Sequence, residues 1–426
     1  MKKRGFIALL LTVIVLLGLL SGCQTESPDA GESQGSTPAS EGDKPLIEKI
    51  DNLSEDFIFG MDASCVPALE NSGVKYYGFD GQEQDVFKIL ADNGINYIRV
   101  RVWNNPYDAE GNGYGGGNCD IDNAVAIGKR ATQYGMKLLV NFHYSDFWAD
   151  PNKQMVPLAW KDMNVEEKAQ ALYAYTKESL QLLKDAGIDV GMVQVGNETT
   201  GKMCGESSWD NICTLMRAGS DAVREVFPDA QVAVHFTNPE KSGNYRYYAQ
   251  QLAKYQVDYD VFASSYYPYW HGSVWNLSNV LTEISGDFHK KVMVVETSYA
   301  YTDQDSDYSG NTISATSQVA KKYSYSVEGQ MKAIRDVVKA VAAVPGGIGV
   351  FYWEGTWITV GQTSWEENSQ KWETYGSGWA SSYAKAYDPV DAGKWYGGCA
   401  VDNQALFDAN GKPLESLKVF SMLRGE

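Results

Sequence analysis

Short apolar runs rich in valine, isoleucine and aromatic residues alternate with longer amphipathic stretches along the chain from residue 57 onward. The short runs predict buried parallel strands, and the amphipathic stretches between them predict crossover helices. Turn signals such as Asn93-Gly94 and Ala186-Gly187 follow a helical stretch and precede a strand. Helices are expected at 84–93, 120–134, 165–186 and 327–344, and strands at 57–63, 96–103, 137–144, 190–197, 231–237, 261–267, 291–297 and 347–353.

Eight strand-helix units predict an α/β fold, a single (β/α)8 TIM barrel with long strand-to-helix loops, formed by residues 46–426. Such barrels span roughly 200 to more than 400 residues, so a second folded domain is not required. Their active sites lie at the C-terminal ends of the strands. The residues that close the expected strands are therefore the candidates for chemistry.

The N-terminus has a different character from the rest of the chain. A basic start and an apolar stretch lead into Leu20-Ser21-Gly22-Cys23, an order typical of a secretory signal. Its ending resembles a bacterial lipoprotein signal, with residues 1–22 removed and Cys23 carrying the lipid; an ordinary signal peptide or a membrane anchor is the alternative. Residues 23–45 are mostly serine, glycine and acidic residues, which predicts a disordered linker. We expect an extracytoplasmic, membrane-anchored lipoprotein, at the cell surface or secreted.

The formal charge of the chain is −18 at pH 7, which disfavours a nucleic-acid partner and suits a neutral substrate and a divalent cation. We expect a monomer. Cys204 and Cys213 lie close together in the sequence, in a compartment that permits disulfides, and could staple the loop between them.

Two glutamates each close an apolar run: Glu198 after Val-Gly-Met-Val-Gln-Val-Gly-Asn, and Glu296 after Val-Met-Val-Val. One carboxylate at a strand end is more often a structural residue than a catalyst. A pair that leaves buried strands can divide the acid and nucleophile roles of a glycosidase. Retaining glycosidases hold the two carboxyl groups about 5 to 5.5 Å apart and inverting ones about 6.5 to 9.5 Å, a distance that a sequence does not give.

Other strand ends supply groups that suit a sugar. Asn197 precedes the first glutamate and is expected to bond the hydroxyl beside the reacting carbon. A guanidinium can keep a nucleophilic carboxylate ionised. Of Arg99 and Arg101 we expect only one to point into the barrel, because side chains alternate along a strand, and we assign that role to Arg99.

Polar and aromatic side chains cluster after several strands, as expected for sugar hydroxyls and flat pyranose faces. The four histidines have no metal-ligand spacing, so His143 is interpreted as a substrate contact and not as a zinc ligand. Many of the aromatic residues are expected simply to be buried. The full set of predicted substrate-binding residues is Arg99, Trp103, His143, Asp146, Trp148, Asn197, His235, Tyr267, Trp353 and Trp357.

An acidic segment, residues 303–311, follows the seventh expected strand. Oxygen ligands at alternate positions can wrap a calcium ion, although the closing ligand of a helix-loop-helix calcium site is missing. A solvated acidic loop is the alternative.

Six stretches together resemble the arabinogalactan endo-β-1,4-galactanases, glycoside hydrolase family 53. The resemblance covers about residues 55 to 424. The stretches are Gly60-Met61-Asp62-Ala63-Ser64, Arg99 to Asp108, Asn141 to Pro151, Gln194 to Thr199, Val294 to Tyr299 and Trp353 to Ile358.

This resemblance implies a barrel of the large retaining clan that hydrolyses β-1,4-D-galactosidic linkages inside the galactan or arabinogalactan side chains of pectin. It implies Glu198 as acid/base and Glu296 as nucleophile. It also implies a structural calcium ion after strand seven. Ser309 stands where some relatives have a histidine, and His235-Phe236-Thr237-Asn238 departs from the expected strand-five ending. The implied calcium ligands are Asp305, Asp307, Ser309, Asn311 and Asp402.

Two alternatives remain open from the sequence. Another retaining TIM-barrel endo-glycosidase, a mannanase or β-glucanase, would use the same two glutamates. A non-catalytic sugar-binding lipoprotein is the other, although such proteins usually have two lobes joined by hinge strands, unlike eight strand-helix repeats.

Overall fold

A computed structural model describes residues 47–390, 392 and 396–426. The chain divides into two units, Met1–Lys44 and Pro45–Glu426, and all described residues belong to the second. The predicted signal peptide, the lipid-bearing Cys23 and the linker lie outside the described residues. Within the part that is described, no helix is long and apolar enough to cross a membrane.

Eight parallel strands close into a barrel in which each strand pairs with the next along the chain and the last pairs with the first. This confirms the predicted single (β/α)8 barrel, and all eight strands coincide with predicted runs. The strands are β1 Ile58–Asp62, β2 Tyr97–Val102, β3 Lys137–Phe142, β4 Val190–Val195, β5 Gln231–Phe236, β6 Val261–Ser265, β7 Lys291–Thr297 and β8 Gly347–Tyr352.

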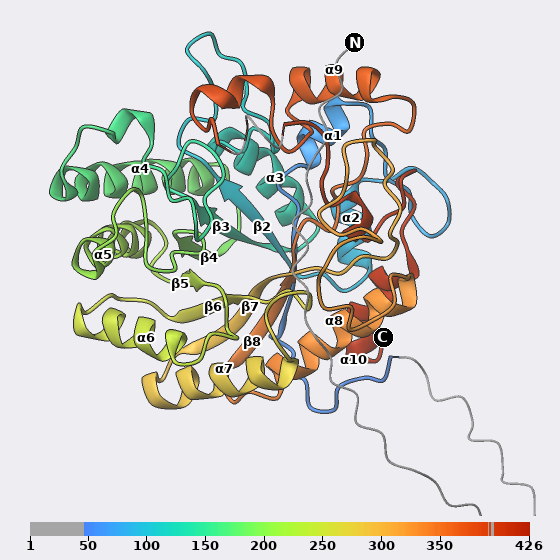
Figure 1. The fold of residues 1–426 in the computed structure, drawn as a ribbon. Helices are drawn as coiled ribbons and strands as arrows, with labels where there is room; N and C mark the ends of the chain where they lie inside the picture. The colour runs from blue at the N-terminus through green and yellow to red at the C-terminus, as the bar shows by residue number, and fades with distance from the viewer. Residues whose placement is uncertain (1–46, 391, 393–395) are drawn as a thin grey trace, which may run out of the picture. The chain divides into compact units, whose positions relative to one another are not determined.

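Helices surround the strands (Figure 1). Many begin with a side chain that caps the first turn, as Asp120 does for α3 and Asn164 for α4, where Asn164 and Glu167 form a reciprocal capping box. The α-helices are α1 Val66–Asn71, α2 Val86–Asp92, α3 Ile121–Gln133, α4 Val165–Asp185, α5 Trp209–Val226, α6 Asn244–Lys254, α7 Val274–Phe288, α8 Val327–Ala342, α9 Trp365–Tyr375 and α10 Val419–Arg424. Short 3₁₀ turns lie at Leu158–Trp160, Ser382–Ala386, Asp402–Gln404 and Glu415–Lys418.

Alternating side chains divide the apolar residues between two layers. One layer packs between strands and helices, and a smaller one, including Tyr97, Leu139, Met192 and Phe351, fills the barrel itself. A Cβ on Gly60 would lie 2.1 Å from the Phe351 ring, so only glycine fits there. Because side chains fill the interior of the barrel, a ligand can bind only at its mouth, where the strands end.

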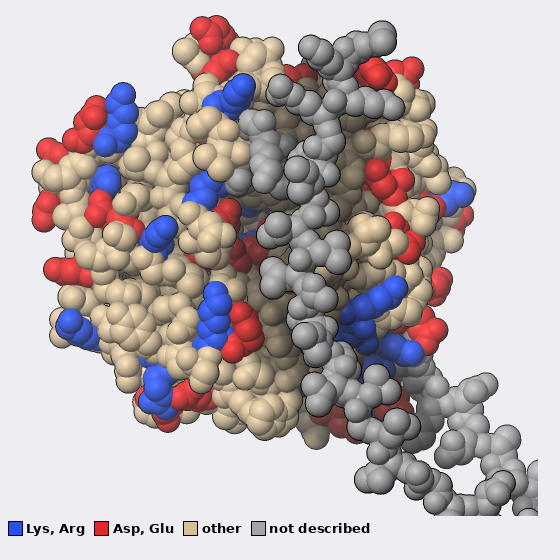
Figure 2. Space-filling model, in the orientation of Figure 1, with Lys and Arg blue, Asp and Glu red and all other residues tan. Residues whose placement is uncertain are grey.

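A third apolar cluster lies over the mouth and joins Trp103, Trp148 and Trp357 to Trp372 of α9. On the face shown in Figure 2, acidic and basic side chains are interspersed, and neither sign of charge covers the surface alone.

Candidate active site

The two predicted catalytic glutamates line one cleft at the mouth of the barrel. Glu198 follows β4 in the left-handed backbone region, with φ of 45°, and is partly buried, while Glu296 belongs to β7 and is 7% exposed. Other residues of the cleft wall are Arg99, Arg101, His143, Trp148, Asp150, Asn197, Tyr267, Trp270, Ser298, Trp353, Trp379 and Gln404.

Glu296 is held at both carboxylate oxygens. Arg99 Nη2 lies 2.9 Å from Oε1, and the Tyr267 hydroxyl donates to Oε2 over 3.0 Å. Burial raises the pKa of Glu296, and the positive charge of Arg99 opposes that rise. The guanidinium therefore favours the ionised form that a nucleophile requires.

Glu198 has a different environment. The Ser265 hydroxyl donates to its Oε1 over 2.6 Å, and no ion pair joins it to a described cation. Burial, followed by the negative charge of Glu296, raises the pKa of Glu198 to about 8. At neutral pH Glu198 therefore carries a proton that it can give, beside a carboxylate that is paired with a cation.

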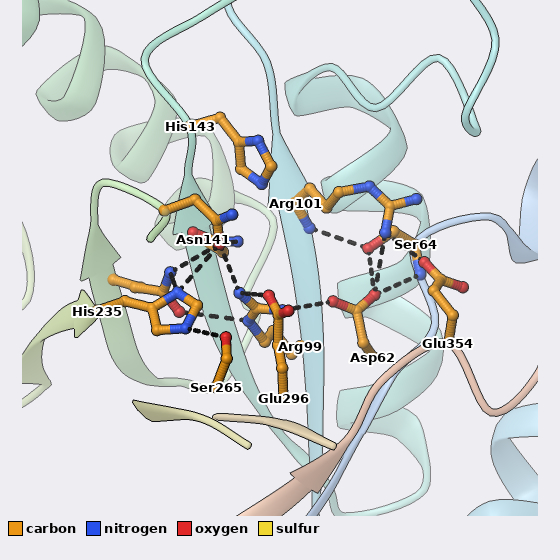
Figure 3. Close-up of polar contacts among 12 residues, drawn as sticks. Asp62, Ser64, Arg99, Arg101, Asn141, His143, His235, Ser265, Glu296 and Glu354 are labelled. Atoms are coloured by element: carbon orange, nitrogen blue, oxygen red, sulfur yellow. Dashed lines mark hydrogen bonds and ion pairs between the residues drawn. The ribbon is translucent and has the colours of Figure 1, made fainter. Parts of the chain in front are cut away.

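Arg99 connects the nucleophile to the rest of the site (Figure 3). Its guanidinium also donates to Asp62 Oδ2 over 2.9 Å, to Asn197 Oδ1 over 2.9 Å and to Gln194 Oε1 over 3.3 Å. Asp62 is the register neighbour of Arg99 on the adjacent strand β1. All of these side chains are at least 95% buried, so the network fixes Arg99 in a single orientation.

The expectation that only one of the two arginines points into the barrel is wrong. Residues two apart on a strand share a face, and Tyr97, Arg99 and Arg101 all lie on the inner side of β2. Arg101 Nη1 contacts Glu354 and Asp62, and its guanidinium lies 4.3 Å from the centre of the Trp148 ring. Arg101 thus packs on the tryptophans of the cleft wall, whereas Arg99 forms the ion pair with Glu296.

Asn197 and His143 each keep one N–H group that can donate to a polar ligand. Asn197 accepts from Arg99 and from Asn141 and donates from Nδ2 to the Ala149 carbonyl over 2.9 Å, which leaves one amide hydrogen. The Nδ1 atom of His143 accepts from Trp103 Nε1 and from the Ala149 N–H, so Nε2 carries the ring hydrogen. Burial and the charges of Arg101 and Arg99 lower the pKa of His143 well below its usual value, so the ring is a neutral donor.

Parallel indole rings form one wall of the cleft. Trp379 stacks on Trp148 with ring centres 4.5 Å apart, Trp357 lies parallel to both, and Trp353 is tilted against them. Trp148, Trp353 and Trp379 line the cleft, and so does Trp270, which packs on Tyr267 and is 45% exposed. Flat apolar faces beside polar donors suit a chain of sugars.

Four predicted substrate contacts do not line the cleft. Trp103 and Trp357 are fully buried behind its wall. Asp146 accepts from the Asn105 and Leu158 backbone N–H groups and so fixes a loop. His235 is fully buried beneath Glu198. These corrections have a common cause. A position near a strand end does not show whether a side chain lines the cleft or supports another side chain that lines it.

Several residues of the site were missed by the sequence analysis. Ser265, Thr237 and Gln194 are polar residues within predicted strands, so a complete inventory of polar side chains in the strands would have found them. Trp379 lies beyond α9, far from any strand end, and no spacing in the sequence pointed to it.

The expected staple between Cys204 and Cys213 is wrong. All five cysteines in the described ranges are free and buried, and these two pack in the main apolar core.

Three of the predicted calcium ligands come together. Oxygen atoms of Asp305, Asp307 and Asp402 lie within 4.8 Å of one another. Burial and mutual repulsion raise the pKa of Asp307 to about 8, and burial is the main cause that raises that of Asp402 to about 7. Asn311 donates to Asp402 over 2.8 Å, whereas Ser309 Oγ accepts from the Gly398 N–H and takes no part in the carboxylate group.

Comparison with known proteins places the chain in a family. The model of Glycosyl hydrolase family 53 matches residues 58–420, and the chain belongs to this family. It is 58% identical over 377 residues to the endo-beta-1,4-galactanase of Bacillus subtilis (strain 168), with 88% of each chain covered. It is 34% identical over 332 residues to the arabinogalactan endo-beta-1,4-galactanase of Cellvibrio japonicus (strain Ueda107), covering 74% of this chain and 85% of that one.

A solved structure agrees with the fold and the family. The Ignisphaera aggregans GH53 catalytic domain superposes with a TM-score of 0.78 at 35% identity, covering 88% of this chain and 99% of that domain.

Proposed function

We propose that this chain is an endo-acting β-1,4-galactanase that cleaves (arabino)galactan with retention of anomeric configuration. The observation that carries the proposal is the pair of glutamates in one cleft with unlike partners: the Ser265 hydroxyl donates to Glu198, and the Arg99 guanidinium pairs with Glu296. Burial and the neighbouring charge of Glu296 raise the pKa of Glu198, which suits an acid. The galactan specificity is supported by the two galactanases to which the chain is similar.

The proposed reaction has two steps. First, Glu198 gives its proton to the glycosidic oxygen while a Glu296 oxygen attacks the anomeric carbon, which releases one half of the chain and forms a glycosyl ester. Glu198, now ionised, then takes a proton from a water molecule as that water attacks the same carbon and frees Glu296. Tyr267 and Arg99 orient the nucleophile throughout.

The aromatic wall fits an internal segment of a polysaccharide. Trp148, Trp353 and Trp379 pack together in the cleft wall, and Trp270 of the same cleft packs instead on Tyr267. The neutral Nε2–H of His143 and the remaining amide hydrogen of Asn197 are donors for sugar hydroxyls. Such an arrangement favours cuts inside a chain over removal of single terminal sugars.

A structural calcium ion is part of the proposal. Three crowded carboxylates are the oxygen donors that a hard cation prefers, and a cation would relieve their repulsion. The Asn311 Oδ1 atom is buried and has no partner among the described residues, so rotation of this amide would offer it as a fourth oxygen. Asp305, Asp307, Asn311 and Asp402 would hold the ion, which supplies charge neutralisation to the loop.

The experiment compares linear β-1,4-galactan, mannan and mixed β-glucan as substrates for the chain from about residue 45, with product sizes followed over time. Early release of short galacto-oligosaccharides from galactan alone is expected. Glu296→Gln should abolish cleavage and retain oligosaccharide binding, because the amide keeps the shape and loses the nucleophile. Cleavage of mannan or glucan with inert galactan would overturn the substrate, and full activity of the variant would overturn the mechanism.

A further inference from the structure

A buried histidine and a serine lie directly behind the proposed acid. Ser265, at the end of β6, places its hydroxyl 2.6 Å from Glu198 Oε1. His235 of β5 places Nε2 2.8 Å from the same hydroxyl, a contact drawn in Figure 3. Both residues are fully buried. Neither lines the cleft, and the Ser265 hydroxyl connects the pair to the Glu198 carboxylate.

The hydrogen bonds around His235 fix where its ring hydrogen lies. Arg99 can only donate, so Gln194 must turn its Oε1 toward Arg99 and its Nε2 toward His235 Nδ1, 3.0 Å away. The Glu198 backbone N–H also points at Nδ1, over 3.2 Å. The Asn197 Oδ1 atom also lies 3.2 Å from Nδ1, but it accepts from Arg99 and Asn141. Because the Glu198 backbone N–H can only donate, Nδ1 is the acceptor and the ring hydrogen lies on Nε2.

This assignment sets the direction of the whole chain of hydrogen bonds. His235 Nε2–H donates to Ser265 Oγ, so the single hydroxyl hydrogen of Ser265 is directed to Glu198 Oε1. Burial and the charge of Arg99 lower the pKa of His235 well below its usual value, so the ring stays neutral and its tautomer does not change over the working pH range.

A second pair of the same kind lies beside the first. The Tyr267 backbone N–H donates to Nδ1 of His271 over 3.0 Å, which leaves the hydrogen on Nε2, 3.5 Å from Thr237 Oγ1. The Thr237 hydroxyl in turn hydrogen-bonds the Glu198 carboxylate. This contact of His271 is longer, so the pair of His235 and Ser265 is the stronger support.

We infer that His235 and Ser265 form a one-way hydrogen-bond relay that orients Glu198, keeps its Oε1 atom an acceptor and directs the acid proton to Oε2. The inference rests on the proposed role of Glu198 as acid/base. His235, Ser265 and, more weakly, Thr237 and His271 are positioning residues, since they act through Glu198. A donor aimed at a carboxylate also favours the ionised form, which the second step of the reaction requires.

Several other groups influence Glu198 and must stay unchanged in the test. They are Glu296 on β7, Asp150 after β3, Tyr267 after β6, Tyr245 on α6 and, through Glu296, Arg99 on β2.

The test is a carboxyl-carbon NMR titration of glutamate-labelled protein, with the Glu198 signal assigned from Glu198→Gln. Ser265→Ala should raise the pKa of Glu198 by about one unit, the size of one lost hydrogen bond to a charged group. Ser265→Thr keeps the hydroxyl and should stay near the wild-type value. Ser72→Ala removes a buried hydroxyl that bonds Ser377 and serves as a control that should not move the signal.

Kinetics separate the relay from the proposed function. On galactan, the basic limb of kcat/KM should move upward in Ser265→Ala by the same amount, and kcat should fall about tenfold because the acid is misplaced. Combining this change with His235→Gln should cost little more than either alone, because both break one relay.

If Ser265→Ala changed neither the pKa of Glu198 in the NMR titration nor the basic limb of kcat/KM, the relay would be overturned. Cleavage of galactan by the wild-type protein would then still support the proposed function. Wild-type protein that fails on every glycan would overturn the function, and the NMR titration would still decide the relay.

Discussion

Arg99 offers the sharpest test of how the site is held together, because one buried guanidinium contacts both Asp62 and Glu296 at 2.9 Å. Two substitutions separate its charge from its shape. Arg99→Met keeps much of the apolar length and removes the charge. Arg99→Lys keeps the charge and removes the planar fork that contacts four side chains.

The size of the effect follows from burial. Arg99 and Asp62 are fully buried, and Glu296 is 7% exposed, so solvent screens these pairs little. Removing one partner of a buried ion pair costs about 3–5 kcal/mol, mainly from the carboxylate left uncompensated. Asp62 keeps its contacts with Arg101 and the Ser64 hydroxyl, so only the Glu296 carboxylate loses its cation. The loss of stability should therefore correspond to one broken ion pair and not to two.

The pH dependence has a definite sign. Without Arg99, the pKa of Glu296 should rise further, because burial then acts unopposed. The acidic limb of kcat/KM should move to higher pH in Arg99→Met. The loss of stability should be largest at high pH and shrink as the pH falls, since protonation removes the uncompensated charge. Arg99→Lys should lie between the wild type and Arg99→Met in both the position of the acidic limb and the loss of stability.

The assay is urea unfolding from pH 5 to 8, together with pH profiles on galactan, for the three proteins. Wild-type stability at pH 8 and an unmoved acidic limb in Arg99→Met would refute the assignment of Arg99 as the group that keeps Glu296 ionised. A control in a solvent-exposed ion pair, Arg246→Met, should lower the stability far less than Arg99→Met does, because water screens the exposed charges.

Three further predictions concern other parts of the chain. Because the pKa values of Asp307 and Asp402 are raised, the calcium-free folded state should lose stability as the pH rises from about 4 to 8. The gain in melting temperature when calcium is added to chelated protein should grow over the same interval. A gain that does not depend on pH, or no gain at all, would argue against the site. Trp379→Ala should raise KM for galactan about tenfold with kcat nearly unchanged, since ~1.4 kcal/mol of remote stacking would be lost, whereas the same change at the surface residue Trp275 should leave KM unaltered. Cys23→Ala in the full chain should move activity from the membrane fraction to the soluble fraction, and activity that stays with the membrane would contradict the lipid anchor.

The barrel could be predicted because its signal is local and repeated. Each strand is a short apolar run, each helix has its own period, and eight repetitions leave few alternative topologies. The ends of strands β4 and β7 then brought Glu198 and Glu296 to one mouth, because parallel strands of a barrel all end on the same side.

The parts that failed depend on side-chain direction and on contacts distant in sequence. Asp146 and His235 occupy strand ends, yet they support other groups, and only packing decides that. Trp379 reaches the cleft from a segment whose position depends on the apolar cluster over the mouth. Cys204 and Cys213 are near in sequence but pack separately in the core, since sequence proximity does not set the geometry that a disulfide needs.

The most direct measurement is proton NMR of the reducing-end anomeric signals during the first minutes of hydrolysis of linear β-1,4-galactan. With Glu296 as nucleophile and Glu198 as acid and then base, the β-anomer should form first and the α-anomer should follow only by mutarotation. First appearance of the α-anomer would mean direct attack by water, and it would contradict the covalent role assigned to Glu296.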